Sequence, residues 1–249
     1  LAEFVAADTI GVADGGTGLT TVAASNLLTG NGASALSAEA NLTFDGTSTF
    51  ALTSTTNPQI LRMDLDTGSG RSYHLRNNSS GQFSIYDDDA SAVRLQVDSS
   101  GAVTKPANPC FLVQDTTVAT DATGDGTPYT LTWETEIYDQ GGNFASNTTF
   151  TAPVAGRYLF SVQCGMNGQT SSHTYVSLII NTHNRNYQNT TNPSSQIVPG
   201  GYTCRSNTVI ADMDATDTMY ASITVSGSTK SVEIGGSAGY FYMSGCLIS

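Results

Sequence analysis

Charged residues are scarce in this chain of 249 residues, since Asp, Glu, Lys and Arg make up only 12% of it, against about a quarter in an average protein. The 9 basic residues form no cluster and are outnumbered by 21 acidic ones, which gives a net charge of −12. An acidic surface repels the phosphates of nucleic acids and anionic lipids. We therefore expect no nucleic-acid partner and no attachment to an acidic membrane surface.

Long apolar runs are missing as well. No stretch approaches the roughly 20 apolar residues that span a bilayer, so we expect no membrane insertion. The first ten residues, LAEFVAADTI, have neither the basic start nor the apolar run of a signal peptide. Because the chain starts with Leu1 and not with Met, we interpret the sequence as part of a longer protein.

Cysteine and histidine are few, and neither is spaced for metal binding or catalysis. The cysteines stand at 110, 164, 204 and 246, without the close pairs that a zinc site requires. This is too few for a disulfide scaffold, so we expect mostly buried thiols. The 3 histidines accompany no Gly-x-Ser-x-Gly or other nucleophile motif. The sequence therefore predicts a protein that is not an enzyme and needs no cofactor.

Small and polar residues dominate the first 40 positions, which are rich in Gly, Ala, Thr and Ser. Two interpretations remain open for this segment: a flexible linker, or a three-chain segment in which small residues let neighbouring backbones approach closely. Its apolar stretch, Val22 to Leu28, could form two helical turns, which is too short for a helix that is stable alone.

Residues 41–106 contain short stretches in which apolar and polar residues alternate, such as QILRM, RSYHLR, GQFSIYD and AVRLQV. This period of two predicts strands with one apolar face each. A few strands of about five residues do not form a stable free-standing sheet. Identical chains are the simplest source of a partner surface. Pro106 and Pro109 mark the expected domain boundary.

Residues 107–249 form a second and more apolar series, which includes YTLTW, GRYLFSVQC and GYFYMSGCLI. Gly, Asn, Ser and Asp turns separate these stretches at the spacing of an antiparallel sandwich. No stretch beyond Ala23 has a helical period. We therefore predict an all-β chain with three parts, 1–40, 41–106 and 107–249.

The second series resembles the complement-component-1q-like globular heads, which are jelly rolls of the tumour-necrosis-factor type. The pattern Phe-x-x-Pro-x-x-Gly-x-Tyr-x-Phe and a closing Ser-Gly pair carry the resemblance, and they appear here as Phe150, Pro153, Gly156, Tyr158, Phe160 and Gly245. The resemblance implies a ten-stranded antiparallel jelly-roll sandwich that packs as a homotrimer. It also implies that the first and last strands pair, which would bring Cys110 close to Cys246. The family's usual Gly is replaced by Thr216.

The N-terminal part resembles phage tail-fibre shafts, because DGGTGLTT and LLTGNGASALS are similar to the Gly-Gly-Thr-Gly segments of such fibres. The order of a fibre-like shaft and a jelly-roll head implies a structural protein of a bacteriophage virion fibre. Such a protein would be assembled in the host cytoplasm, would join other fibre or tail proteins through its N-terminal part, and would bind a host surface glycan or protein during adsorption.

Loops on a rigid β-scaffold are the usual place for recognition. We expect the receptor-binding loops at Met166–His173, Thr190–Gly201 and Ser226–Ala238. Side chains there or nearby that could stack on a saccharide or hydrogen-bond to it are His173, Arg185, Tyr187, Asn189 and Tyr202. Without such a role, His173 is interpreted as a surface or turn histidine.

Two further hypotheses concern acidic residues. Asp121 and Asp125 offer the hard oxygen ligands that calcium prefers, although turn-forming carboxylates are the commoner case. A fibre-associated polysaccharide depolymerase would need paired carboxylates in a groove, for which Glu134 and Glu136 are candidates on one short strand. A secreted, trimeric complement-1q-like adhesin or ligand is the remaining alternative.

Overall fold

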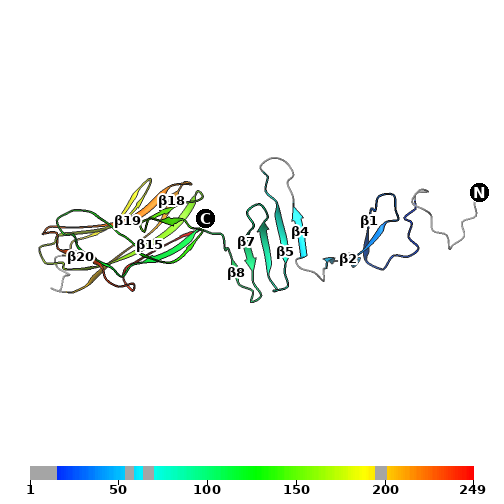
Figure 1. Ribbon diagram of the computed structural model, residues 1–249, viewed down its shortest axis with the longest axis horizontal. Helices are drawn as coiled ribbons and strands as arrows, with labels where there is room; N and C mark the ends of the chain where they lie inside the picture. Colours follow the sequence, from blue (N-terminus) through cyan, green and yellow to red (C-terminus); the bar gives the residue numbers. More distant parts are fainter. Residues whose placement is uncertain (1–15, 54–58, 64–69, 194–200) are drawn as a thin grey trace, which may run out of the picture. The chain divides into compact units, whose positions relative to one another are not determined.

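The computed structural model describes residues 16–53, 59–63, 70–193 and 201–249, which form strands, turns and loops without a helix (Figure 1). The predicted all-β fold is confirmed. The chain divides into two compact units, Leu1–Lys105 and Pro106–Ser249. Residues 1–15 of the predicted fibre-like segment lie outside the described residues.

The first unit holds two antiparallel sheets, one of three strands and one of five. Its strands are β1 (Asn26–Thr29), β2 (Ser37–Phe44), β3 (Phe50–Leu52), β4 (Gln59–Met63), β5 (Tyr73–Asn77), β6 (Phe83–Asp87), β7 (Ala92–Val97) and β8 (Val103–Thr104). The stretch Val22 to Leu28 does not form the two helical turns that it could have formed, because Asn26–Thr29 pairs with β2 instead. Strand pairing satisfies backbone groups that two turns of helix would leave without partners.

The five-stranded sheet is a meander in which each strand pairs with the next. One cross-strand row on its apolar face contains Leu61, Leu75, Ile85 and Leu95. Within one chain this face is poorly covered, since Leu61 is 56% exposed, Met63 51% and Phe83 45%. The alternation predicted from the sequence is present, but the apolar face that it creates lacks a second layer within the described part of the unit.

Three polar side chains of this sheet are buried, those of His74, Ser84 and Asp87. The Arg76 guanidinium lies 3.6 Å from the centre of the Tyr86 ring, and its Nε donates to Ser84 Oγ at 3.2 Å. Asp87 is fully buried and accepts hydrogen bonds from Arg71 and from Arg94, whose Nη2 lies 2.7 Å away. Charged and aromatic side chains therefore cover one another.

The second unit is a sandwich of a seven-stranded and a six-stranded antiparallel sheet. Its strands are β9 (Cys110–Gln114), β10 (Val118–Thr123), β11 (Tyr129–Thr130), β12 (Thr135–Gln140), β13 (Phe144–Ala145), β14 (Thr149–Thr151), β15 (Gly156–Asn167), β16 (Tyr175–Thr182), β17 (Asn186–Thr191), β18 (Thr203–Met213), β19 (Thr218–Ser226), β20 (Val232–Gly235) and β21 (Tyr242–Leu247). The chain passes repeatedly from one sheet to the other, as in a jelly roll. Short segments, namely β11, β13 and β14, raise the number of strands above the ten implied by the resemblance.

A continuous core fills the space between these two sheets. Along β15 the side chains alternate, so that Tyr158, Phe160 and Val162 are fully buried while Leu159 points outward and is 39% exposed. The facing strands β16 and β19 contribute Leu178 and other aliphatic side chains. Each large apolar side chain buried in this way contributes about 1.5–3 kcal/mol. The second unit thus contains its own interior.

The residues of the predicted head signature occupy positions where the surrounding packing restricts which residue type fits. A Cβ on Gly245 would come within 2.5 Å of the Phe111 ring and 2.6 Å of the Phe160 ring, so only Gly fits between them. Phe150 packs against Tyr158, with ring centres 5.5 Å apart, and the Tyr158 hydroxyl donates to the Val154 carbonyl at 2.8 Å. These contacts join the turn at Pro153, which precedes Gly156 at the start of β15, to the core.

Candidate functional site

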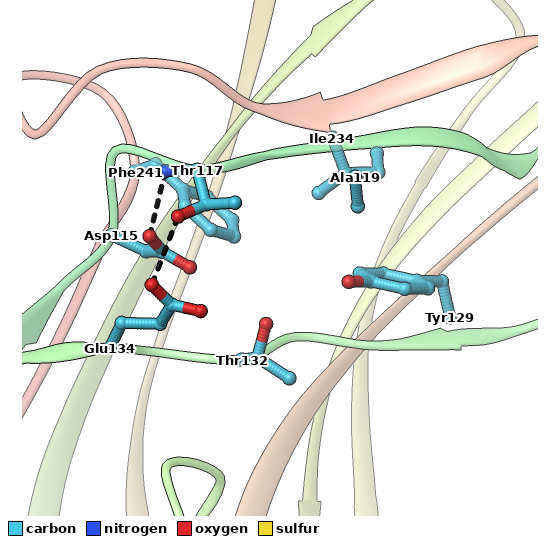
Figure 2. A pocket seen from close by; sticks show the side chains of 8 residues that line it. All are labelled: Asp115, Thr117, Ala119, Tyr129, Thr132, Glu134, Ile234 and Phe241. Atoms are coloured by element: carbon cyan, nitrogen blue, oxygen red, sulfur yellow. Dashed lines mark hydrogen bonds between the residues drawn. The ribbon is translucent and has the colours of Figure 1, made fainter.

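A hollow of about 190 Å³ opens in the second unit (Figure 2). Its lining comes from β10, β11, β20 and the irregular segments beside them: Asp115, Thr117, Ala119, Tyr129, Thr132, Glu134, Ile234 and Phe241. The predicted strand YTLTW ends early, at Thr130, because Leu131 and Trp133 turn into the core. This departure from the strand places Thr132 and Glu134 on the hollow.

Two carboxyl groups stand on one side of the hollow and share Thr117 as a neighbour. The Thr117 backbone N–H donates to Asp115 Oδ1 at 2.7 Å, and its hydroxyl donates to Glu134 Oε2 at 3.1 Å. Asp115 is only 3% exposed, yet among the described residues no group donates a hydrogen bond to its Oδ2. In Figure 2 this second oxygen points toward the space between Glu134 and Tyr129. The site therefore offers one acceptor on the nearly buried Asp115 and others on the exposed Glu134.

The remaining walls combine hydroxyl groups with apolar surface. The hydroxyls of Tyr129 and Thr132 border the space, while Ala119, Ile234 and the Phe241 ring form its apolar side (Figure 2). Phe241 is held by Trp133, whose ring centre lies 4.6 Å away. No Lys, Arg or His belongs to the lining. Chemically, the hollow suits a small ligand with hydrogen-bond donors, especially positively charged ones.

Sequence reasoning missed this site. It paired Glu134 with Glu136, but Glu134 faces the hollow with Asp115, and Glu136 lies on β12 opposite Val113. The two carboxyl groups of the hollow are 19 positions apart in the sequence. The sequence showed only that Asp115 and Glu134 each lie beside a predicted strand. That observation does not predict that the two side chains border one hollow.

The outward face of the seven-stranded sheet forms a second candidate surface. A cross-strand row on it contains Ile210, Leu159, Cys246 and Cys110. Ile210 is 57% exposed, and Tyr138 on the neighbouring strand β12 is 47% exposed. The row contains no charged residue. It therefore has the composition of the core of a protein–protein contact.

Cys110 and Cys246 lie opposite each other on β9 and β21, and all four cysteines are free thiols. Burial raises the pKa of the Cys246 thiol to about 11, and its hydrogen bond and charge repulsion with Cys110 add to the shift. Burial also raises the pKa of Cys164, which is fully enclosed. These thiols are held in their weakly reactive protonated form at neutral pH.

His173 lies in a turn, as one of its two interpretations expected, but it is fully buried, so the expectations of a surface position and a receptor contact are wrong for this residue. The turn after β15 folds back on itself, and the backbone N–H of Thr170 donates to His173 Nδ1 at 2.9 Å. The other ring nitrogen, Nε2, is buried and has no hydrogen-bond partner among the described residues. The ring closes the turn and cannot reach a receptor.

The other four predicted receptor residues do not form one site. Arg185 is exposed and lies close to His183. The His183 N–H donates to the Thr218 carbonyl, which places this loop near the start of β15. Tyr202, in contrast, directly precedes β18 and lies near the end of β15. About ten residues of strand, or roughly 30 Å, lie between these two levels. Tyr187 packs partly against the core, and Asn189 donates to the Ser206 carbonyl at 2.7 Å.

Tyr202 is the most accessible aromatic among these candidates. It is 55% exposed, and its ring centre lies 6.1 Å from that of Tyr240. Its role in receptor binding stays a prediction. In the predicted loop Thr190–Gly201, residues 194–200 lie outside the described residues.

The calcium candidates do not converge. Asp121 lies in β10 with a φ of 50°, and Asp125 accepts a hydrogen bond from the Thr127 N–H at 2.9 Å. This bond lowers the pKa of Asp125 below its usual value. Within the described ranges, no group of three or more His, Cys, Asp or Glu side chains could hold a metal ion. Asp125 acts here as a turn residue, and Asp121 belongs to the irregular part of β10.

Among the residues that the structure describes, no helix is long and apolar enough to span a membrane. No protein-family model matches the chain, and none of the curated proteins matches it. Solved structures do match, and two of them illustrate the similarity. The globular domain of zebrafish complement 1qA protein is 14% identical, with a TM-score of 0.39, and the match covers 57% of this chain and 98% of that one. Murine APRIL at pH 8.0 is 10% identical, with a TM-score of 0.42, and the match covers 57% of this chain and 99% of that one.

Proposed function

We propose that the chain is a structural subunit of a homotrimeric virion fibre whose C-terminal head binds a receptor on the host-cell surface. The expected receptor is a saccharide. The N-terminal part would join the fibre to other fibre or tail proteins, and the location is the virion, after assembly in the host cytoplasm. The fibre role is supported by the resemblance of the Gly-Gly-Thr-Gly segment to phage fibre shafts.

The bare apolar face of the five-stranded sheet is the observation that carries the assembly proposal. Leu61 and Met63 are more than half exposed, although they alternate with polar residues as core residues do. Burying apolar surface contributes roughly 25 cal/mol per Å². A sheet of a few short strands needs that contribution from a second layer, and further copies of the chain can provide it.

The head supports a threefold assembly in another way. Its signature residues, from Phe150 to Phe160, resemble those of heads that form trimers. The uncharged row with Leu159 and Ile210 is the outward face that such a trimer would cover. Closed rotational symmetry would bury this face in all three copies at once.

Light scattering of the full chain tests the assembly. We expect a mass three times the 26.0 kDa of one chain. Leu61→Glu would place a charge on the bare apolar face and should lower the mass at micromolar concentration. Thr104→Glu adds the same charge on the opposite side of the same sheet and should leave the trimer intact. A folded, stable wild-type monomer would contradict the proposal.

The receptor role has its own test. Virions that lack residues 106–249 of this chain should lose adsorption to their host, and unchanged adsorption would rule out the role. Purified virions should contain the chain. If the chain is instead secreted by cells and missing from virions, the alternative of an adhesin or ligand replaces the fibre.

A further inference from the structure

The hollow beside Asp115 and Glu134 lies outside the surface that we propose for assembly. All eight lining residues come from one chain, and none belongs to the outward row with Leu159. Asp115 is nearly fully buried but keeps one carboxyl oxygen without a hydrogen-bond donor among the described residues. This oxygen borders the hollow, so a ligand that enters can donate a hydrogen bond to it.

The volume restricts what can enter. About 190 Å³ is less than the roughly 300–1,000 Å³ of pockets that take drug-sized ligands. The space accepts a single ring or a short chain. The mixture of apolar wall and hydroxyl groups suits a ring whose faces differ in polarity (Figure 2).

The charge of the site restricts the ligand further. Two carboxyl groups border the space, and no cationic side chain lines it. An ammonium group on the ligand would make charge-assisted hydrogen bonds, which are about twice as strong as neutral ones. The hydroxyls of Thr132 and Tyr129 remain for the ligand's own hydroxyl groups.

We propose that this hollow binds one sugar unit that carries a free ammonium group, as in an amino sugar that is not N-acetylated. The ammonium lies between Asp115 Oδ2 and Glu134, and the sugar hydroxyls face Thr132 and Tyr129. The inference rests on the proposed receptor binding and specifies the saccharide class that the head recognises.

Calorimetric titration of the full chain with three methyl glycosides tests this assignment. The probes are methyl glucosaminide, methyl glucoside and methyl N-acetylglucosaminide, which differ only at the C2 substituent. We expect saturable binding of the glucosaminide, one per chain, and at least about tenfold weaker binding of the other two, since loss of about 1.4 kcal/mol is tenfold. Equal binding of all three, or no binding of the glucosaminide, would overturn the proposal.

Matched variants test whether the glucosaminide binds in the hollow. Asp115→Asn keeps the acceptor for the Thr117 N–H and removes the charge, and Glu134→Gln changes the more exposed carboxyl group. Each should weaken glucosaminide binding about tenfold, because each removes one charged partner. Glu136→Gln removes one negative charge from the same segment outside the hollow and should have no effect. Equal effects of Glu134→Gln and Glu136→Gln would show nonspecific attraction to an acidic protein and overturn the site.

Two further readouts separate the site from the wider function. If virions still adsorb through the head but the glucosaminide does not bind, only the sugar assignment fails. If the chain is monomeric, the fibre proposal fails while the hollow, which is built by one chain, can still be titrated. Release of shorter products from a glucosamine oligosaccharide would overturn a pure binding site in favour of hydrolysis by the carboxyl pair.

Discussion

The two units of this chain differ in how completely one chain buries their apolar residues. In the second unit, two sheets enclose Phe160, Leu178 and their neighbours, so one chain supplies the whole interior. In the first unit, a five-stranded sheet has the same alternation of residues, but Leu61, Met63 and Phe83 remain about half exposed. Alternation of apolar and polar residues therefore determines which face of a sheet is apolar. Whether one chain can bury that face depends on whether the same chain also supplies a second layer.

A core substitution in the second unit should have the largest effect. Phe160→Ala removes a fully buried ring, and such truncations cost about 3–5 kcal/mol. We expect this loss of unfolding free energy in denaturant melts at every protein concentration. Ser161→Ala, which changes the outward neighbour, should cost less than about 0.5 kcal/mol. A loss for Phe160→Ala that grows on dilution would contradict a core within one chain.

The matching substitution in the first unit should behave differently. Phe83 is 45% exposed in one chain, so in a monomer its truncation should change stability by the same amount at every protein concentration. If other copies cover Phe83, Phe83→Ala should cost about 1.5–3 kcal/mol, and its unfolding midpoint should fall on dilution. An unfolding midpoint that does not change on dilution would contradict the coverage.

Acid should weaken the first unit through Asp87. Burial raises the pKa of this carboxyl, but hydrogen bonds from Arg94, the Ala90 N–H and Arg71 outweigh burial and hold the pKa below its usual value. A depressed folded pKa gives stability that is present above the unfolded pKa of about 3.9 and is lost as the pH falls through the folded value. Circular dichroism melts should show this loss below about pH 4. Asp87→Asn should reduce the dependence, and an unchanged curve would contradict it.

The smallest expected effect is a gain in the second unit. Thr216 adopts a φ of 75°, where the resembled family has Gly. The left-handed region costs a residue with a Cβ about 1–2 kcal/mol, and part of this is offset by the greater chain entropy of Gly. Thr216→Gly should therefore raise the unfolding free energy by about 0.5–1 kcal/mol, measured by thermal melts.

The neighbouring position supplies the control for this gain. Ala215 precedes Thr216 in the same turn but does not have a positive φ. Ala215→Gly therefore relieves no backbone strain and adds only chain entropy to the unfolded state, so it should destabilise the unit. A gain from Ala215→Gly as large as that from Thr216→Gly would show that the strain at Thr216 is not the cause.

Strands and their faces could be predicted from the sequence, because alternation is a local property. The core positions Tyr158 and Phe160 followed from a motif, and Gly245 followed from its place in the closing strand. The burial of His173 could not be predicted, since it depends on a turn that folds back through Thr170.

The candidate site could not be predicted from the sequence for a related reason. Thr132 and Glu134 reach the hollow only because Leu131 and Trp133 leave the strand pattern and enter the core. Whether Leu131 and Trp133 enter the core depends on the space between the two sheets, and a local sequence pattern contains no information on that space. The same irregular segment brings Glu134 to the hollow that Asp115 also lines.

Oxidation of the methionines tests the coverage of the first unit most directly. The chain has 5 Met. Met166, Met213, Met219 and Met243 are buried in the second unit, whereas Met63 is 51% exposed in one chain. Peroxide converts accessible Met to the sulfoxide, and mass spectrometry of peptides follows each site. If other copies cover the sheet, Met63 of the full assembly should oxidise as slowly as the four buried residues. Oxidation of Met63 at the rate of the unfolded chain, with the other four protected, would contradict the account.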